Sequence, residues 1–355
     1  MTDIIKYTSL FSCAGIGETF NADVGLEATV SNELLGDRAR YYQAIYKTST
    51  MIPGDIMDDE TLDKLIKAHI DKGCTLTLMS PPCQDFSTAG ARDHTNPRAF
   101  LYEQGLKFLE GVNEINEHVF IEEVPAFFTA KLNGETTILS IIKDKLYELG
   151  YKYISHAILD PAYYGVPQHR KRAFIVASKK GLWRLPKKEL DEPLTIRHAI
   201  AHLPSLESGE YSDIPYHYAP YWSKRCVDIM KHTPSGCSAF LNPSQWTPVK
   251  EDNTDCSFYQ SAWRRADWDK PSGAILMKSA GMGGMISCHP GRLLEDGTYS
   301  DARAFTPKEL MLLSSLPDDY KVPAFALNND ELIRDIIGEC VCPIMERKIM
   351  ELIPR

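Results

Sequence analysis

The segment Ser80–Gln84, Ser-Pro-Pro-Cys-Gln, is the part of the chain best suited to covalent chemistry. It follows the apolar run Leu76–Met79, and its two prolines fix the backbone so that Cys83 stands on a loop at a strand end. A lone cysteine is most often a small buried hydrophobe, and Cys83 is one of nine. A thiol held at the carboxyl end of a strand suits a nucleophile better, provided that a positive neighbour favours its thiolate form. Cys83 is therefore the candidate nucleophile.

Charged and polar side chains at two other strand ends could assist such a nucleophile. Glu122 and Glu123 end an apolar run, and because successive side chains of a strand point to opposite faces, only one of these carboxylates can face a site. Gln168, Arg170 and Arg172 alternate at the start of a strand, so we expect them on one face, where they would bind anions or polar base edges. The alternatives are a solvated strand end and a solvated basic surface.

The segment Leu10–Gly17, Leu-Phe-Ser-Cys-Ala-Gly-Ile-Gly, is a small-residue turn between a predicted strand and a predicted helix. In a doubly wound sheet, ligands bind at the carboxyl ends of strands, and glycines let the backbone approach them. Glu33 ends the next strand, about 20 residues further on, where an acidic residue suits ribose hydroxyls. Asp55 is a third strand-end carboxylate. A glycine-rich turn alone is often only a tight connection, but the two carboxylates favour a nucleoside-containing cofactor.

Short apolar runs alternate with helical patterns over the first half of the chain, which indicates an α/β fold with a doubly wound, mostly parallel sheet. The predicted strands are Ile5–Phe11, Glu27–Ser31, Leu76–Met79, His118–Glu122, Tyr153–Leu159 and Ala173–Ala177. The predicted helices lie near residues 17–25, 37–48, 59–70, 99–115 and 135–148. Beyond Leu185 the sequence indicates a smaller, irregular domain, and residues 306–316 and Gly338–Ile353 are again predicted to be helical.

Whole-chain composition limits the class of protein. The chain has 355 residues, 43% of them hydrophobic, which is enough for one or two domains. No apolar stretch approaches the roughly 20 residues of a membrane span and no signal peptide is evident, so we expect a cytoplasmic protein. The spacing of the cysteines predicts neither disulfides nor a metal site. The formal net charge of −9 argues against nucleic acid as a partner unless basic residues gather in one cleft.

The order of these segments resembles that of the cytosine-5 DNA methyltransferase family, and the resemblance continues to the C-terminus. Later blocks of the family are similar to Trp268–Ser272, Arg303–Glu309 and Gly338–Pro343, and only residues 190–262 match poorly. The resemblance implies a class I, Rossmann-like methyltransferase fold. Residues 1–185 plus 325–355 would form the catalytic domain that binds S-adenosylmethionine, and residues 186–324 would form the target-recognition domain that binds DNA.

The resemblance also implies a mechanism, because cytosine C5 is too weak a nucleophile to accept a methyl group directly. The thiolate of Cys83 would add to C6 and make C5 enamine-like, and S-adenosylmethionine would donate the methyl group. A base would then remove the C5 proton, and the cysteine would leave by β-elimination. Glu122 would hold the N3 edge of the cytosine and Arg172 its O2. Arg170 and Gln168 would shape and support the site.

For the cofactor, the resemblance implies an adenosine that packs on Phe11, a ribose bound by Glu33, and an adenine edge read by Asp55 and Ile56. Leu34 stands where relatives often have an aromatic residue. The complete set of cofactor-binding residues implied is Phe11, Gly15, Gly17, Glu33, Leu34, Asp55, Ile56, Pro82, Leu101, Glu339 and Val341. Leu101 would cover the other face of the adenosine, and Pro82 and Val341 would line the methionine end.

For duplex DNA, the resemblance implies a flipped-out cytosine and a recognition loop at Gly281–Gly284, whose glycines would let the backbone enter the major groove. A simple flexible turn is the alternative. The residues expected to contact DNA are Gln84, Ser87, Arg98, Lys224, Arg225, Lys231, Arg264, Arg265, Gly281, Gly283 and Gly284. We expect a monomer that acts at the nucleoid, and a cognate restriction endonuclease could work beside it.

Two other functions remain open: an RNA (tRNA) cytosine-5 methyltransferase of the same fold, and a catalytically inactive DNA-binding relative. The family pattern is broken at Glu123 and Glu339, where relatives have asparagine. Near the amino-acid end of the cofactor, Glu339 would repel the cofactor's carboxylate or favour its ammonium group. We therefore hypothesise that cofactor affinity is weakened, or that a variant of S-adenosylmethionine is preferred.

Overall fold

The structure is a computed structural model that describes residues 4–82, 100–132, 136–249, 262–281 and 288–355. The chain divides into two compact units. The first comprises Met1–Asp160, Lys171–Lys187 and Met345–Arg355, and the second comprises Pro161–Arg170 and Lys188–Ile344. The division does not test the functions predicted for the catalytic and target-recognition domains, so these assignments stay a prediction.

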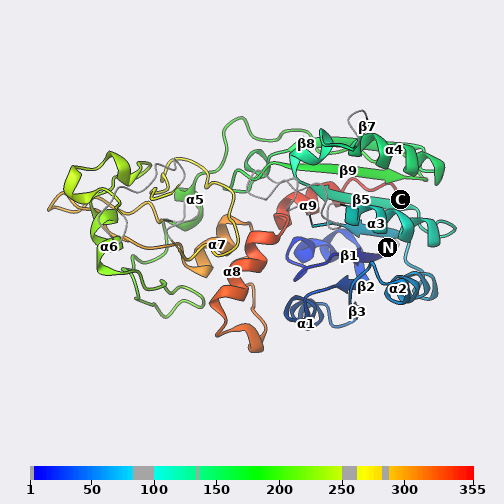
Figure 1. Cartoon of the computed structure of the whole chain (residues 1–355), viewed down its shortest axis with the longest axis horizontal. Coiled ribbons are helices and arrows are strands. Elements are labelled where there is room, and N and C mark those ends of the chain that lie inside the picture. The colour runs from blue at the N-terminus through cyan, green and yellow to red at the C-terminus, as the bar shows by residue number, and fades with distance from the viewer. Residues whose placement is uncertain (1–3, 83–99, 133–135, 250–261, 282–287) are drawn as a thin grey trace. The chain divides into compact units, whose positions relative to one another are not determined.

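A seven-stranded sheet runs through the first unit (Figure 1). Its strands are β1 (Ile5–Leu10), β2 (Leu26–Glu33), β3 (Thr50–Pro53), β4 (Leu76–Met79), β5 (His118–Glu123), β8 (Tyr153–Leu159) and β9 (Arg172–Ser178). They lie in the order β3-β2-β1-β4-β5-β9-β8. Strand β9 is antiparallel to both of its neighbours, whereas the other strand pairs are parallel. The predicted doubly wound, mostly parallel α/β sheet is therefore confirmed.

Four of the predicted helices are present in the first unit, and one is not. The four are α1 (Gly36–Ile45), α2 (Asp59–Lys72), α3 (Leu101–Gly111) and α4 (Ile138–Glu148). Residues 17–25 do not form the predicted α-helix but two 3-10 turns, η1 (Gly17–Phe20) and η2 (Ala22–Val24). Gly25, at a left-handed φ of 77°, ends the second turn. Strand β3 is missing from the predicted strands because it has only four residues and ends in a proline.

The second unit contains α5 (Ile196–Ile200), α6 (Lys224–Lys231), α7 (Pro307–Leu313) and α8 (Asp330–Glu339). The prediction of one helix over Gly338–Ile353 is wrong: α8 ends at Glu339, and α9 (Pro343–Met350) begins after an extended link. Pro343 has no amide hydrogen and disfavours a helical residue before it, so it can begin a helix but cannot continue one. The short elements are β6 (Lys131–Leu132), β7 (Thr136–Thr137), η4 (Pro125–Phe128), η5 (Pro161–Tyr164), η6 (Ala239–Leu241), η7 (Ser244–Trp246) and η8 (Ala324–Ala326).

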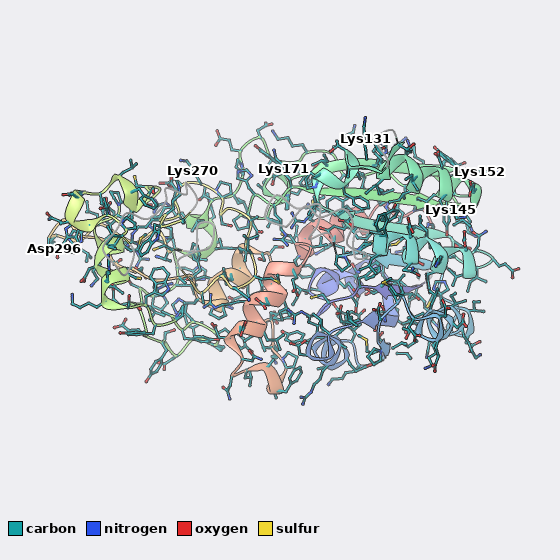
Figure 2. The ribbon with its side chains drawn as sticks, in the orientation of Figure 1. Lys131, Lys145, Lys152, Lys171, Lys270 and Asp296 are labelled. Carbon is teal, nitrogen blue, oxygen red and sulfur yellow. The ribbon has the colours of Figure 1, made fainter. Side chains whose placement is uncertain are left out.

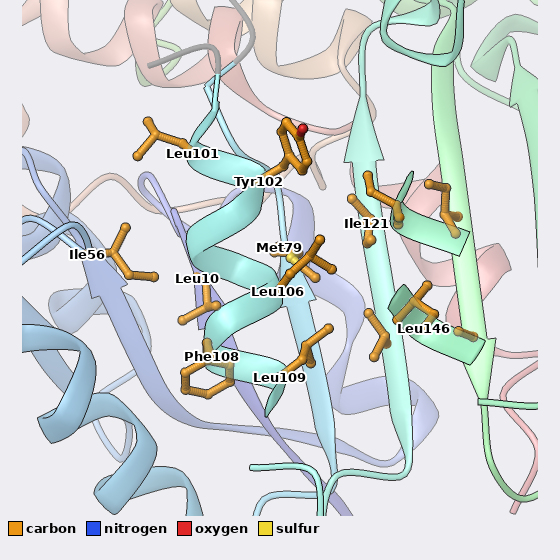
Figure 3. Packing of buried hydrophobic residues seen from close by; sticks show 14 of the residues in the cluster. Leu10, Ile56, Met79, Leu101, Tyr102, Leu106, Phe108, Leu109, Ile121 and Leu146 are labelled. Atoms are coloured by element: carbon orange, nitrogen blue, oxygen red, sulfur yellow. The ribbon is translucent and has the colours of Figure 1, made fainter. Parts of the chain in front are cut away.

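The apolar core of the first unit fixes the strand that leads toward Cys83. Leu106 and Leu109 of α3 lie in one buried cluster with Met79, the last residue of β4 (Figure 3). The helix and the strand approach closely, because a Cβ added at Gly105 would lie 2.5 Å from Sδ of Met79. Burial of each such large side chain contributes about 1.5–3 kcal/mol. This packing therefore fixes the position of the end of β4 and of Pro81 after it.

Some charged side chains are exposed on each of the two units. Lys131 and Lys152 are exposed on the first unit, and Lys270 and Asp296 on the second (Figure 2). None of the helices in the described part of the chain is long and apolar enough to cross a membrane. Among the same residues, no group of three or more His, Cys, Asp or Glu side chains could hold a metal ion.

Candidate active site

Five parallel strands bring many of the predicted site residues to one edge of the sheet. Leu10 lies in register with Asn32 on one side and with Met79 on the other, and Met79 lies in register with Ile121. The segments after these strands therefore emerge along one edge, where doubly wound sheets bind their ligands. The predicted residues at or just beyond this edge are Phe11, Glu33, Leu34, Asp55, Ile56, Pro82 and Glu122.

The turn after β1 has an unusual backbone. Phe11, Cys13 and Gly15 have φ angles of 55°, 47° and 70°, and such values are uncommon for residues with a side chain. Hydrogen bonds hold this conformation: the Ser12 amide donates to the carbonyl of Asn32 (2.9 Å), and the Gly15 amide donates to the carbonyl of Ser12 (2.9 Å). Strained backbone of this kind is found where a ligand is bound. The turn is thus built to present its main chain at the edge.

Glu33 joins this turn to the end of β2. Its Oε2 accepts a hydrogen bond from the Cys13 amide and its Oε1 one from the Leu35 amide, each at 2.8 Å. A carboxylate oxygen can accept more than one hydrogen bond. On the next strand end, Asp55 is exposed and its Oδ1 accepts from the Met57 amide (2.9 Å). Two oriented carboxylates on adjacent strands suit the ribose and base of a nucleoside.

Ser12 gives an independent sign that the edge is made for a ligand. Its hydroxyl oxygen is buried, and none of the described residues forms a hydrogen bond with it. Such a group costs about 1–3 kcal/mol. Apolar walls are provided by Ile56 and Leu101, which are 3% and 8% exposed, and by Leu34, which is 54% exposed. These residues fit a nucleoside-containing cofactor that carries a polar chain.

Glu122 and Arg172 form an ion pair across the antiparallel strands β5 and β9. Nε of Arg172 lies 2.9 Å from Oε1 of Glu122, and their side chains are 19% and 11% exposed. Nη1 of Arg172 also donates to the carbonyl of Lys171 (2.8 Å). Charge-assisted bonds of this kind fix both groups in a partly buried position. Glu123 is 2% exposed, and its Oε2 accepts from the Val124 amide (3.2 Å).

Gln168 and Arg170 do not share a strand face with Arg172, so that prediction is wrong. Strand β9 begins only at Arg172, and the two earlier residues belong to the second unit. Arg170 is buried and donates to the carbonyls of Ile275 (2.7 Å) and Gly338 (2.6 Å). Gln168 is buried and bonds to the amide of Ile275 (3.3 Å), among others. Both side chains hold loops of the second unit together, and their supporting role in catalysis stays a prediction.

Arg265 is not placed to contact DNA, contrary to prediction. It is 0% exposed, and its guanidinium donates to the carbonyls of Met230 (3.0 Å) and His289 (2.8 Å) as well as to those of Asp301 and Tyr299. Phosphate binding would leave these carbonyls unpaired. Its neighbour Arg264 is half-buried and donates to the Gly236 carbonyl (2.7 Å).

The remaining predicted residues are divided among several places. Gly15 and the buried Gly17 lie in the first unit, next to the edge. Glu339 ends α8 and is half-buried, and the buried Val341 follows it; both belong to the second unit, as does the exposed Gly281. Those that lie outside the described residues are Cys83, Gln84, Ser87, Arg98, Gly283 and Gly284.

Sequence reasoning missed a group of buried polar residues beside the turn. Glu18, Tyr42 and Tyr46 all have protein partners near Gly15, and Glu346 reaches the same region from the C-terminal segment. The one visible signal is Glu18 itself, a charged residue in an otherwise small and apolar turn sequence.

The sequence is similar to those of known proteins of one family. The profile of the C-5 cytosine-specific DNA methylases matches residues 5–355. The chain is 39% identical over 351 residues to the Type II methyltransferase M1.HgaI of Avibacterium volantium, with 96% of each chain covered. It is 27% identical to the Type II methyltransferase M1.HphI of Haemophilus parahaemolyticus, over 98% of this chain and 86% of that protein.

Solved structures support the fold. The methyltransferase EhMeth of Entamoeba histolytica gives a TM-score of 0.61 at 18% identity, covering 99% of this chain and 98% of that one. A DNMT2 variant of Spodoptera frugiperda gives 0.60 at 19% identity, covering 98% and 99%. The sheet order and these neighbours show a class I methyltransferase fold, which implies dependence on S-adenosylmethionine. With the family profile matched from β1 to the last residue, the chain belongs to the C-5 cytosine-specific DNA methylases.

Proposed function

We propose that this protein transfers a methyl group from S-adenosylmethionine to C5 of a flipped-out cytosine in duplex DNA, through a covalent bond between Cys83 and C6. The observation that carries the proposal is the Glu122–Arg172 ion pair, at the same sheet edge as the cofactor turn and the end of β4. Because the named relatives are Type II methyltransferases, we further propose that the chain is the modification enzyme of a restriction-modification system.

Cys83 starts the reaction by adding its thiolate to C6 of the cytosine, which makes C5 enamine-like and able to attack an electrophile. Bound S-adenosylmethionine supplies the electrophilic methyl group. A base then removes the C5 proton, and the cysteine leaves by β-elimination to restore the aromatic ring. Pro81 and Pro82 limit the backbone freedom of the segment that leads to Cys83.

Glu122 and Arg172 would hold the base while this happens. Glu122 would bind the N3 edge, where a proton relieves the negative charge that develops on the ring when the thiolate adds. Arg172 would bind O2 with N–H donors of its guanidinium, which has five. Their mutual ion pair orients both groups before the cytosine arrives, and such preorganised charge is effective because it needs no rearrangement during the reaction.

The cytosine has to leave the duplex to reach these groups, since C6 and N3 cannot be approached within the stacked helix. We propose that the segment Gly281–Gly284 reads the flanking bases, and that the protein acts as a monomer alongside a cognate endonuclease. Glu339 and Val341 would meet the amino-acid end of the cofactor.

A trapping experiment tests the proposal. DNA that contains 5-fluorocytosine cannot lose a proton from C5, so the proposed enzyme should form a stable covalent complex in the presence of S-adenosylmethionine. Cys83→Ser should form none, whereas Cys226→Ser, at a half-buried cysteine on α6, should trap as well as the wild type. Methyl transfer to tRNA but not to duplex DNA would identify an RNA enzyme, and DNA binding without trapping would identify an inactive relative. Bisulfite sequencing of DNA from expressing cells would then give the sequence context.

A further inference from the structure

Glu18 is a buried carboxylate immediately after the turn proposed to bind the cofactor, and it is 6% exposed. Its Oε1 accepts a hydrogen bond from Oγ of Ser9 (2.6 Å), and its Oε2 accepts from the hydroxyls of Tyr7 (2.8 Å) and Tyr42 (2.6 Å). Each hydroxyl donates its single proton to Glu18, and these three hydrogen bonds favour the ionised form of the carboxylate, which only accepts. These four residues are called the Glu18 network below.

The network fixes the surface on which the turn rests. Tyr42 of α1 and Tyr46, the residue that caps the carboxyl end of this helix, have ring centroids 4.6 Å apart. Gly15 lies directly against them, because a Cβ added there would fall 2.4 Å from the Tyr46 ring and 2.7 Å from the Tyr42 ring. The Tyr46 hydroxyl also donates to the carbonyl of Gly15 (2.7 Å). Glu18, by holding Tyr42, therefore controls where the backbone of Gly15 can lie.

We propose that Glu18 is a positioning residue for the S-adenosylmethionine site, which joins β1, α1 and the turn in the geometry that the cofactor needs without touching the cofactor itself. This inference rests on the proposed function, since it concerns the same cofactor. Three donated hydrogen bonds favour a carboxylate at this position: the amide oxygen of a glutamine could accept from Tyr7 and Tyr42, but its amide nitrogen could not accept the bond from Ser9.

Glu346 completes the arrangement from the C-terminal helix. It is 3% exposed and accepts a hydrogen bond from Nδ2 of Asn21 (2.9 Å), whose backbone amide donates to the Glu18 carbonyl (2.9 Å). Burial and the charge of Glu18, with a smaller contribution from Glu122, raise the pKa of Glu346 to about 8. Two nearby carboxylates in a dry environment cannot both be ionised at low cost. Burial also raises the pKa of Glu18, but the hydrogen bonds from Ser9, Tyr42 and Tyr7 oppose that rise. Glu346 therefore holds the proton of the pair at neutral pH.

A pH dependence follows from this pair. Above a pH of about 8, Glu346 loses its proton and its charge repels that of Glu18. Tyr42 and Tyr46 keep their protons over this range, because burial and the charge of Glu18 hold the pKa of each phenol well above its ordinary value. The turn should then lose its fixed geometry, and cofactor affinity should fall.

Calorimetric binding of S-adenosylhomocysteine to the whole chain tests the proposal. Glu18→Gln should weaken binding at neutral pH by about tenfold or more, and Tyr42→Phe by about fivefold, the equivalent of one buried hydrogen bond. Tyr151→Phe is the matched control, because it removes an equally buried hydroxyl that bonds to Asn116 at the amino end of β5. It should lower the unfolding temperature and leave the dissociation constant unchanged.

The pH profile separates positioning from simple structural support. Wild-type affinity should fall between about pH 7 and pH 9, and Glu346→Gln, which cannot ionise, should lack that part of the fall. Unchanged affinity in Glu18→Gln, or identical profiles for the wild type and Glu346→Gln, would overturn the inference. If Glu18→Gln does not fold, unchanged affinity in both Tyr42→Phe and Ser9→Ala overturns it. A wild type that binds neither S-adenosylhomocysteine nor S-adenosylmethionine contradicts the proposed function instead.

Discussion

Gly15→Ala should damage both stability and cofactor binding, and the size of the effect can be worked from the structure. Gly15 has a φ of 70°, a conformation that costs an alanine about 1 kcal/mol. The new Cβ would also lie 2.4 Å from the Tyr46 ring, and relief of such an overlap costs about 1–3 kcal/mol. Moving that ring breaks the hydrogen bond from Tyr46 to the Gly15 carbonyl, which adds about 1 kcal/mol. We expect a total loss of about 3–5 kcal/mol of unfolding free energy.

Gly73→Ala separates the two causes. Gly73 has a φ of 68° at the C-cap of α2, but nothing lies within 4 Å of an added Cβ. Its loss should be only about 1 kcal/mol, with S-adenosylhomocysteine binding unchanged. Urea unfolding of the wild type and both variants gives the free energies, and calorimetry gives the affinities. Equal losses of stability in the two variants would refute the claim that the tyrosine wall makes glycine necessary at position 15.

Three further predictions concern charged residues. Glu346→Gln should stabilise the protein increasingly as pH rises from 4.5 toward 8. The reason is that a carboxyl whose pKa is raised from 4.5 to about 8 by folding loses its stabilising effect over that window. Urea unfolding at pH 8 should show a gain of roughly 2–4 kcal/mol, and the absence of a gain would contradict the buried carboxyl pair. Arg265→Ala should lower the free energy of unfolding by about 3–5 kcal/mol, because it leaves buried carbonyls unpaired. The folded fraction of this variant should bind DNA as the wild type does. A defect in DNA binding without a defect in stability would restore Arg265 as a phosphate contact. If the extra charge of Glu339 repels the carboxylate of the cofactor, Glu339→Asn should raise the affinity for S-adenosylmethionine by about fivefold or more in calorimetry. Equal affinities of the variant and the wild type for every cofactor tested would rule out an effect of Glu339 on cofactor binding.

Much of the first unit could be predicted because its signals are local. A parallel strand buried on both faces reads as a short apolar run, and Leu76–Met79 has the predicted bounds in the structure. The edge strand Tyr153–Leu159, antiparallel to β9 and only partly buried, also has the predicted bounds. Two other strand ends lie close to their predicted positions: β2 ends at Glu33, two residues beyond the predicted Ser31, and β5 ends at Glu123, one residue beyond Glu122. The same logic fails for Thr50–Pro53, since four residues ending in a proline give no pattern that distinguishes a strand from a loop.

The part of the site that could not be predicted depends on contacts between distant segments. Asn21 and Glu346 are 325 positions apart and share a hydrogen bond, and no periodicity or local motif connects them. Glu346 is read from the sequence as one more charged residue on an amphipathic helix, whereas the fold buries it beside another carboxyl and changes its protonation. A sequence pattern indicates which residues can ionise, but only the folded environment decides which of them do so.

The folded environment also decides which arginines are available to a partner, and this changes how the acidic net charge should be judged. Arg170, Arg265, Arg303 and Arg334 are 4% exposed or less, and their guanidinium groups donate to backbone carbonyls and, in Arg303 and Arg334, to carboxylates. These side chains count as positive charge in a sequence sum, yet their donors are committed to the protein interior, so they cannot neutralise phosphates at short range. If the proposed function is correct, DNA has to be held by fewer cations than the composition suggests. The choice of cytosine then depends more on base contacts and on the Glu122–Arg172 pair than on a general electrostatic attraction.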